Sequence, residues 1–128
     1  MNRINELAEL PDFFPYHGAS PKAISEAEAA LQTSFADDYS EYLAAFGLVS
    51  ANSHELTGIC PFPRLNVVDV TIAEREFDNS ADVSWYVIER LGIDDVVAWQ
   101  SPEGDIYLTA EGVAPRKVAT SLFDYLSN

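Results

Sequence analysis

The sequence predicts an α+β domain in which helices pack around an antiparallel sheet of about four to six strands. Apolar residues recur at helical spacing over residues 20–47, whereas short runs of β-branched and aromatic residues, separated by turn residues, fill 84–118. Helices that precede a run of strands, with one helix to close the chain, are typical of this class. The length suits one domain, so we expect residues 1–128 to fold as a single unit.

The first segments are short and have clear boundaries. Residues 1–12 are expected to form one or two helical turns, and the aromatic segment that follows is extended because Pro15 disfavours helix before it. Ser20 as N-cap and Pro21 in the first helical position open a helix. We expect this helix to end near residues 32–33.

A second helix begins at Ala36 or Asp37 and ends at Gly47. Its apolar face has i, i+3, i+4, i+7 spacing and consists of Tyr39, Tyr42, Leu43 and Phe46. Asp37, Asp38 and Glu41 lie in its first turns, where carboxylates stabilise the positive end of the helix dipole. Capping of the helix therefore accounts for this acidic run.

The middle of the chain is less regular. Residues 48–65 are expected to be irregular, apart from a short extended piece at 55–59. Residues 67–76 fit two structures. Alternating β-branched residues favour a strand, whereas Asn66 followed by Asp69 resembles a helix cap and the residues after them favour helix. The local pattern leaves both open.

The second half predicts a meander followed by a helix. We expect strands over 84–89, 96–100 and 105–109, a type I turn over 101–104, and an edge strand over 116–118. The final helix begins after Thr120 or Ser121, either of which serves as the N-cap.

The charge of the chain excludes two classes of partner. There are 7 Lys and Arg against 21 Asp and Glu, which gives a formal net charge of −14. Phosphate binding needs clustered basic residues, so we expect neither direct nucleic-acid binding nor binding to an anionic membrane. The charge allows a basic partner, and it also keeps a small protein soluble. The sequence does not indicate the oligomeric state.

The composition indicates a cytoplasmic protein. The single cysteine, Cys60, cannot form an internal disulfide. The first residues do not form a signal peptide, because they have no apolar stretch and carry acidic residues early. No apolar run approaches the roughly 20 residues that a membrane span needs.

Catalytic motifs are not apparent. The two histidines, His17 and His54, do not have metal-ligand spacing with one another, and the glycines are isolated turn residues rather than a phosphate loop. Cys60 lies six residues after His54, but nothing like a nucleophile elbow surrounds it. Neighbouring carboxylates are expected by chance in so acidic a chain. We therefore expect no enzyme, metal or cofactor.

An ordered set of segments resembles the SMI1/KNR4 family. The resemblance covers about Ser20 to Leu126 in the right order, although Ala36 stands where the family usually has proline. The matching segments are Ile24 to Leu31, Phe35 to Tyr39, Tyr42-Leu43, Phe46-Gly47, Tyr86 to Asp94, Val97 to Gln100, Gly104 to Tyr107 and Pro115 to Leu122.

This resemblance implies both a fold and a function. The family belongs to the SUKH superfamily, in which helices pack on an antiparallel sheet, and this implies a helix over residues 67–76. Its small bacterial members are typically immunity proteins that neutralise polymorphic or contact-dependent toxins, often nucleases. Its eukaryotic members are larger regulators of cell-wall synthesis. The family has no catalytic residues to transfer to this chain.

The sequence thus predicts a cytoplasmic immunity protein that blocks the basic surface of a toxin domain, a nuclease being one candidate. The alternative is a regulatory or scaffold module with no toxin partner. Core packing is the default role of the tryptophans, and a place on a binding face is the alternative. The candidate partner-binding residues are Asp37, Asp38, Glu41, Glu55, Asp94, Asp95, Glu103 and Asp105, with Trp99 as an aromatic anchor.

Overall fold

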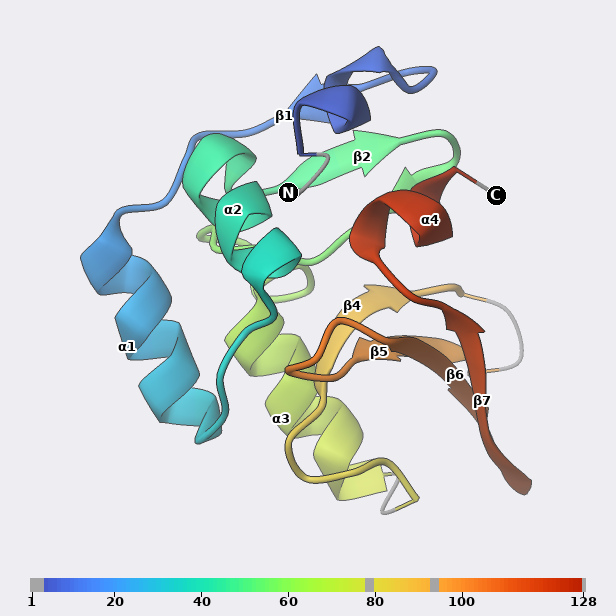
Figure 1. Cartoon of the computed structure of the whole chain (residues 1–128). Helices are drawn as coiled ribbons and strands as arrows, with labels where there is room; N and C mark the ends of the chain where they lie inside the picture. Colours follow the sequence, from blue (N-terminus) through green and yellow to red (C-terminus); the bar gives the residue numbers. More distant parts are fainter. Residues whose placement is uncertain (1–3, 78–79, 93–94, 128) are drawn as a thin grey trace.

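A computed structural model describes residues 4–77, 80–92 and 95–127 (Figure 1). In chain order its elements are the 3₁₀ helix η1 (Ile4–Glu9), β1 (Phe14–Pro15), α1 (Pro21–Leu31), α2 (Asp37–Phe46), β2 (Val49–Ala51), β3 (His54–Glu55), α3 (Val67–Phe77), β4 (Tyr86–Arg90), β5 (Val97–Gln100), β6 (Ile106–Ala110), β7 (Val113–Ala119) and α4 (Leu122–Leu126). None of the helices in these ranges is long and apolar enough to cross a membrane.

The strands form two antiparallel sheets, which confirms the predicted α+β class. The larger sheet is the meander β4-β5-β6-β7, and the smaller one has the order β1-β2-β3 (Figure 1). The four-stranded sheet agrees with the prediction. We did not expect the three-stranded sheet, because residues 48–65 were predicted to be irregular except at 55–59.

The hairpin of β2 and β3 explains that difference. Its strands have only three and two residues, too few to give a clear alternating pattern. Asn52 and Ser53 join them with φ angles of 50° and 67°. Two successive positive φ angles are those of a type I′ turn, which suits the right-handed twist of paired strands. The turn therefore identifies the hairpin better than the strands do.

The helices begin and end at capping residues. Ser20 Oγ accepts a hydrogen bond from Ala23 N at 3.1 Å at the start of α1, and Ser121 is the N-cap of α4. Before α3, Asn66 Oδ1 accepts from Val68 N at 2.9 Å. Residues 67–77 are thus helical, as the resemblance implied, and the strand alternative is wrong. Val67, Val70 and Thr71 are buried on one face of the helix, whereas a strand would place Val70 on the face opposite to Val67 and Thr71.

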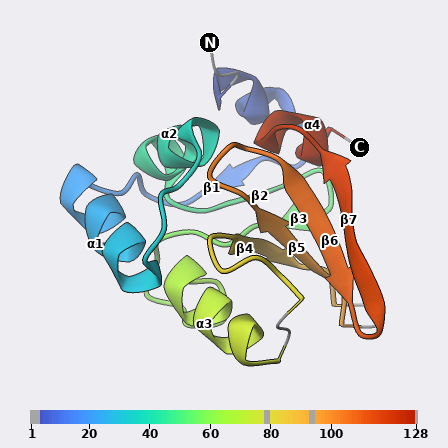
Figure 2. The same cartoon turned by 60° about the horizontal axis from the view of Figure 1, so that its bottom comes forward.

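The larger sheet has a core on each face. Tyr86, Ala98 and Ile106 belong to the main core on the face that packs with α2 and α4. On the opposite face, Val97 and Trp99 pack with Val70 of α3 in a smaller core. Figure 2 shows α3 on one side of the sheet and α2 and α4 on the other.

A close approach of two glycines brings residues 57–59 against the end of α2. Gly47 ends α2 with a φ of 72°. A Cβ atom on Gly58 would lie 1.9 Å from the Gly47 carbonyl oxygen, so a side chain at Gly58 would clash with backbone. Ile59 N donates to that same oxygen at 2.9 Å. This contact positions Thr57 beside the tyrosines of α2.

Buried hydroxyl groups connect α2 to both sheets. Thr57 Oγ1 donates to Val87 O of β4 at 2.8 Å and accepts from the Tyr39 hydroxyl at 2.9 Å. The Tyr42 hydroxyl donates to Thr57 O at 2.7 Å and accepts from Val49 N of β2 at 3.0 Å. Because each of these groups is buried, each bond replaces one that water would otherwise supply.

Thr57→Val tests this network. The variant keeps the volume of the side chain but leaves the Tyr39 hydroxyl and the Val87 carbonyl without their partner. We expect the free energy of unfolding in urea to fall by about 2–3 kcal/mol. Adding Tyr39→Phe removes one orphaned group, so the double variant should lose about 1 kcal/mol less than the sum of the two single variants. Strict additivity would contradict the network.

Alkaline pH gives a second test. Four of the six tyrosines are buried, and desolvation raises the pKa of Tyr39, Tyr42, Tyr86 and Tyr125 above the ordinary value of 10. Above that pH the unfolded chain releases these protons while the folded chain keeps them. Stability should therefore be fully present below about pH 10 and fall above it, by up to about 1.4 kcal/mol per pH unit for each tyrosine.

The measurement is urea unfolding at several pH values, combined with tyrosinate absorbance. The buried tyrosines should ionise only as the protein unfolds. Ionisation of all six tyrosines in a chain that keeps its folded circular dichroism would contradict the assignment.

Candidate functional site

The predicted partner-binding residues do not all lie together, because Asp95 precedes β5 and Glu103 follows the opposite end of that strand. Asp37 and Glu41 are exposed on α2, Glu103 is exposed in the turn before β6, and Asp95 is exposed at the start of β5. Asp94 lies outside the described residues. The start of α2 and the turn before β6 are joined through Gln100, whose Nε2 donates to Asp38 Oδ1 and to Gly104 O.

Asp38 is a structural residue rather than a surface one. Its Oδ1 accepts from Gln100 Nε2 at 3.0 Å, and its Oδ2 accepts from Leu122 N at 2.7 Å. The half-buried carboxylate therefore joins α2 to β5 and caps the first residue of α4. The sequence predicts that Asp38 stabilises the start of its own helix, α2. In the structure its carboxylate accepts from the first residue of a different helix, α4. A contact with a partner would compete with both bonds.

Trp99 cannot anchor a partner in this fold, so that prediction is corrected. Its side chain is fully buried, with 0% exposure, in the smaller core. Its indole Nε1 donates to Thr109 Oγ1 of β6 at 2.8 Å. Trp99 lies on the face of the sheet that α3 covers, and this packing removes it from the surface. It has the core role that we took as the default.

Two further predicted acids have basic neighbours within the chain. Glu55 accepts from Arg64 at 3.0 Å, and both side chains are well exposed. Asp105 lies 3.2 Å from Lys117 Nζ across the β6–β7 pair. Exposed pairs of this kind contribute little to stability and separate easily. Glu55 and Asp105 therefore remain available to a partner.

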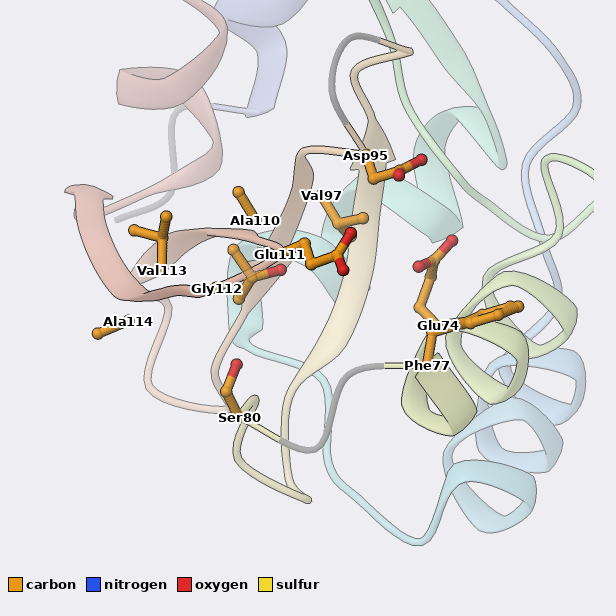
Figure 3. A pocket seen from close by; sticks show the side chains of 11 residues that line it. Glu74, Phe77, Ser80, Asp95, Val97, Ala110, Glu111, Gly112, Val113 and Ala114 are labelled. Atoms are coloured by element: carbon orange, nitrogen blue, oxygen red, sulfur yellow. The ribbon is translucent and has the colours of Figure 1, made fainter.

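The structure places Asp95 in a hollow that the sequence did not predict. This hollow, here called the α3–hairpin groove, has a volume of about 700 Å³ (Figure 3). It lies between the second half of α3, the start of β5 and the β6–β7 hairpin. Its lining includes Glu74, Phe77, Asp95, Val97 and residues 109–114. The volume is in the range of sites that bind small molecules or single side chains of a partner.

The register of the sheet explains why the groove exists. Val97 pairs with Thr109, and Trp99 pairs with Tyr107, so these four side chains share one face. Helix α3 covers β4 on that face, and its second half stops short of the hairpin (Figure 2). Val97 and Thr109 are left as the floor.

Three carboxylates surround the groove, from three different elements. Figure 3 shows Glu74 on α3, Asp95 before β5 and Glu111 at the tip of the hairpin. Glu74 accepts from Arg90 Nε at 2.7 Å. Within the described ranges, no ion pair is found for Asp95 or Glu111. The groove therefore has a negative field.

Glu74 and Glu111 were missed because they are brought together only by folding. They are 37 positions apart in the sequence, and neither belongs to a motif. The available signal was local: Glu111-Gly112 falls between the strands expected to end at 109 and begin at 116, so an exposed turn could be predicted there. The sequence does not predict that α3 faces this turn.

A buried carboxylate, Glu89, has polar partners like those of an acid–base site, but it serves to join elements. Glu89 accepts from His54 Nδ1 and Glu55 N, each at 2.8 Å, and from the Tyr125 hydroxyl. The Glu89 side chain is only 6% exposed. A β-bulge between Val87 and Glu89 turns Glu89 toward the inside of the fold. The carboxylate thereby connects β3, β4 and α4.

The role of Asp38 gives a test with a matched control. Asp38→Ala removes the acceptor of two hydrogen bonds, and we expect the free energy of unfolding to fall by about 2–3 kcal/mol. Asp37→Ala removes a neighbouring exposed carboxylate that acts only through the helix dipole, so its cost should stay below about 1 kcal/mol. Equal losses in urea unfolding would show that Asp38 contributes only its charge.

Comparison with known proteins supplies no residue roles. Neither the scan against protein-family models nor the search of curated proteins found a match to this chain. Among the residues in the described ranges, no group of three or more histidines, cysteines, aspartates or glutamates could hold a metal ion.

Proposed function

We propose that this chain is a cytoplasmic immunity protein of the SMI1/KNR4 type. It binds and neutralises a polymorphic or contact-dependent toxin that has a basic surface, a nuclease being the class that its charge suits best. Two features support the proposal: the ordered resemblance from Ser20 to Leu126 and the excess of carboxylates in the chain. In this role the chain acts as a binding protein and not as an enzyme.

The observation that carries the proposal is the large excess of carboxylates. The net charge is −14, and several of the few basic side chains are already engaged within the chain. Arg64, Arg90 and Lys117 pair with acids. Arg75 donates to the carbonyl oxygens of Leu31, Val83 and Trp85. The field outside the molecule is consequently negative.

A negative field of this size favours association with a basic protein. A nuclease needs Lys and Arg to hold the phosphates of its substrate. An acidic inhibitor is attracted to that same surface and excludes the nucleic acid once it is bound. Neutralisation by this mechanism requires stoichiometric binding and no chemical step.

Co-expression tests the proposal. The chain is produced in cells together with the toxin domain encoded next to its gene, and growth and co-purification are scored. We expect growth to be restored and the two proteins to purify as one complex. A toxin domain of equal basicity from an unrelated system is the control, and it should not be neutralised. Absence of rescue would favour the regulatory or scaffold alternative.

The salt dependence of binding tests the electrostatic part. We expect the association rate constant of the complex to fall about tenfold or more when salt is raised from about 50 mM to about 500 mM. The dissociation rate constant should change much less. Stopped-flow or surface-based kinetics provide both constants. An association rate that does not change with ionic strength would contradict attraction by charge.

A further inference from the structure

We infer that the α3–hairpin groove is the part of this chain that receives a basic segment of its protein partner, with lysine or arginine heads at the carboxylates and an apolar side chain at the rim. The inference rests on the proposed function and makes it more specific, because it names the surface and the chemistry of the segment that binds there.

The carboxylates determine the sign of the charge on the segment that binds in the groove. Glu74, Asp95 and Glu111 approach the groove from three elements, as Figure 3 shows. Arg90 offsets only Glu74. An acidic or phosphorylated segment would be repelled, whereas a basic one gains from each carboxylate. A second copy of the chain, with its net charge of −14, is also disfavoured.

The groove is lined by apolar side chains as well as by carboxylates. Val97 is buried in the floor, and Phe77 and Val113 stand at the rim with 87% and 60% of their surface exposed. Phe77 and Val113 add exposed apolar surface beside the carboxylates. The stem of a lysine or arginine packs on apolar surface while its head reaches a carboxylate. The lining therefore suits basic residues in particular.

The backbone around the groove excludes pairing by an added strand. Strands β5 and β6 are bonded on both sides within the sheet, so their backbone groups are not free. The edge strand beside the groove is β7, which contains Pro115, Arg116 and Lys117, residue types that protect edges. Recognition in the groove must therefore use side chains.

A synthetic probe tests the groove without knowledge of the partner. A short blocked peptide of alternating lysine and leucine is titrated into the ¹⁵N-labelled full chain. We expect amide shifts to change at residues 74–77, 95–97 and 109–114. A peptide of alternating glutamate and leucine should produce no such changes, and one of lysine and serine should bind more weakly. Shifts spread evenly over the acidic surface would overturn the inference.

A pair of matched variants separates the groove from general charge. Asp95→Asn/Glu111→Gln and Glu9→Gln/Glu26→Gln each remove two exposed carboxylates, the first pair in the groove and the second outside it. Asparagine tolerates the positive φ of 55° at position 95. We expect the first variant to bind the lysine–leucine peptide about fivefold more weakly and the second less than about twofold. Equal losses would contradict the groove.

Phe77→Ala tests the apolar part. The side chain is almost fully exposed, so the variant should unfold at the same urea concentration as the parent. We expect it to bind the lysine–leucine peptide more weakly and the lysine–serine peptide unchanged. If the variant binds both peptides as the parent does, Phe77 makes no apolar contact with the bound segment and only charge attracts it. That result would overturn the inference, which requires an apolar contact at the rim.

The two proposals can fail separately. If the chain restores growth but the groove signals do not respond to the peptide, the immunity function stands and the groove is not its binding site. If the groove binds the basic peptide but no toxin is neutralised, the groove chemistry stands and the immunity function is wrong.

Discussion

Thr57 lies where α2, β2 and β4 meet, and its hydrogen bonds determine how the other layers pack. Its side chain and backbone engage Tyr39, Tyr42 and β4 at once. These groups are buried, so an error in their relative placement would leave a donor or acceptor without any partner. A purely apolar interface tolerates small shifts, but this network does not. The main core and the relative positions of the two sheets follow from it.

The acidic residues of the chain divide into two groups with different duties. Asp38 and Glu89 face inward and accept hydrogen bonds that join separate elements, and the Glu28 carboxylate accepts from Phe35 N at 2.8 Å. Within the described ranges, exposed acids such as Asp37, Glu41 and Glu103 face water and contribute to the negative field. Net charge alone cannot separate these groups, although only the second group can meet a partner without cost to the fold. The number of carboxylates that a partner can contact is thus limited by how many acids the fold itself uses.

Local chemistry made much of the fold predictable. The helices have strong caps and apolar faces, such as Ser20 for α1 and Gly47 for α2, and the strands of the meander are long enough to show their pattern. The β2–β3 hairpin was missed because strands this short have no period. The groove could not be predicted either, since Glu74 and Glu111 become neighbours only through the sheet register and the placement of α3. Trp99 shows the same limit, because a strand pattern does not say which face a helix covers.

Helix α4 is short, yet three distant parts of the chain depend on it. Asp38 reaches Leu122 across 84 positions, Asn52 donates to the Leu126 carbonyl oxygen, and Tyr125 donates to Glu89. Contacts between residues so far apart in sequence form late and slow the folding of a chain. During synthesis, α2 and the small sheet therefore lack these partners until residues 122–126 have emerged from the ribosome. A chain interrupted before residue 122 lacks three residues of the main core, Leu122, Tyr125 and Leu126. It also leaves Asp38, Asn52 and Glu89 without these partners.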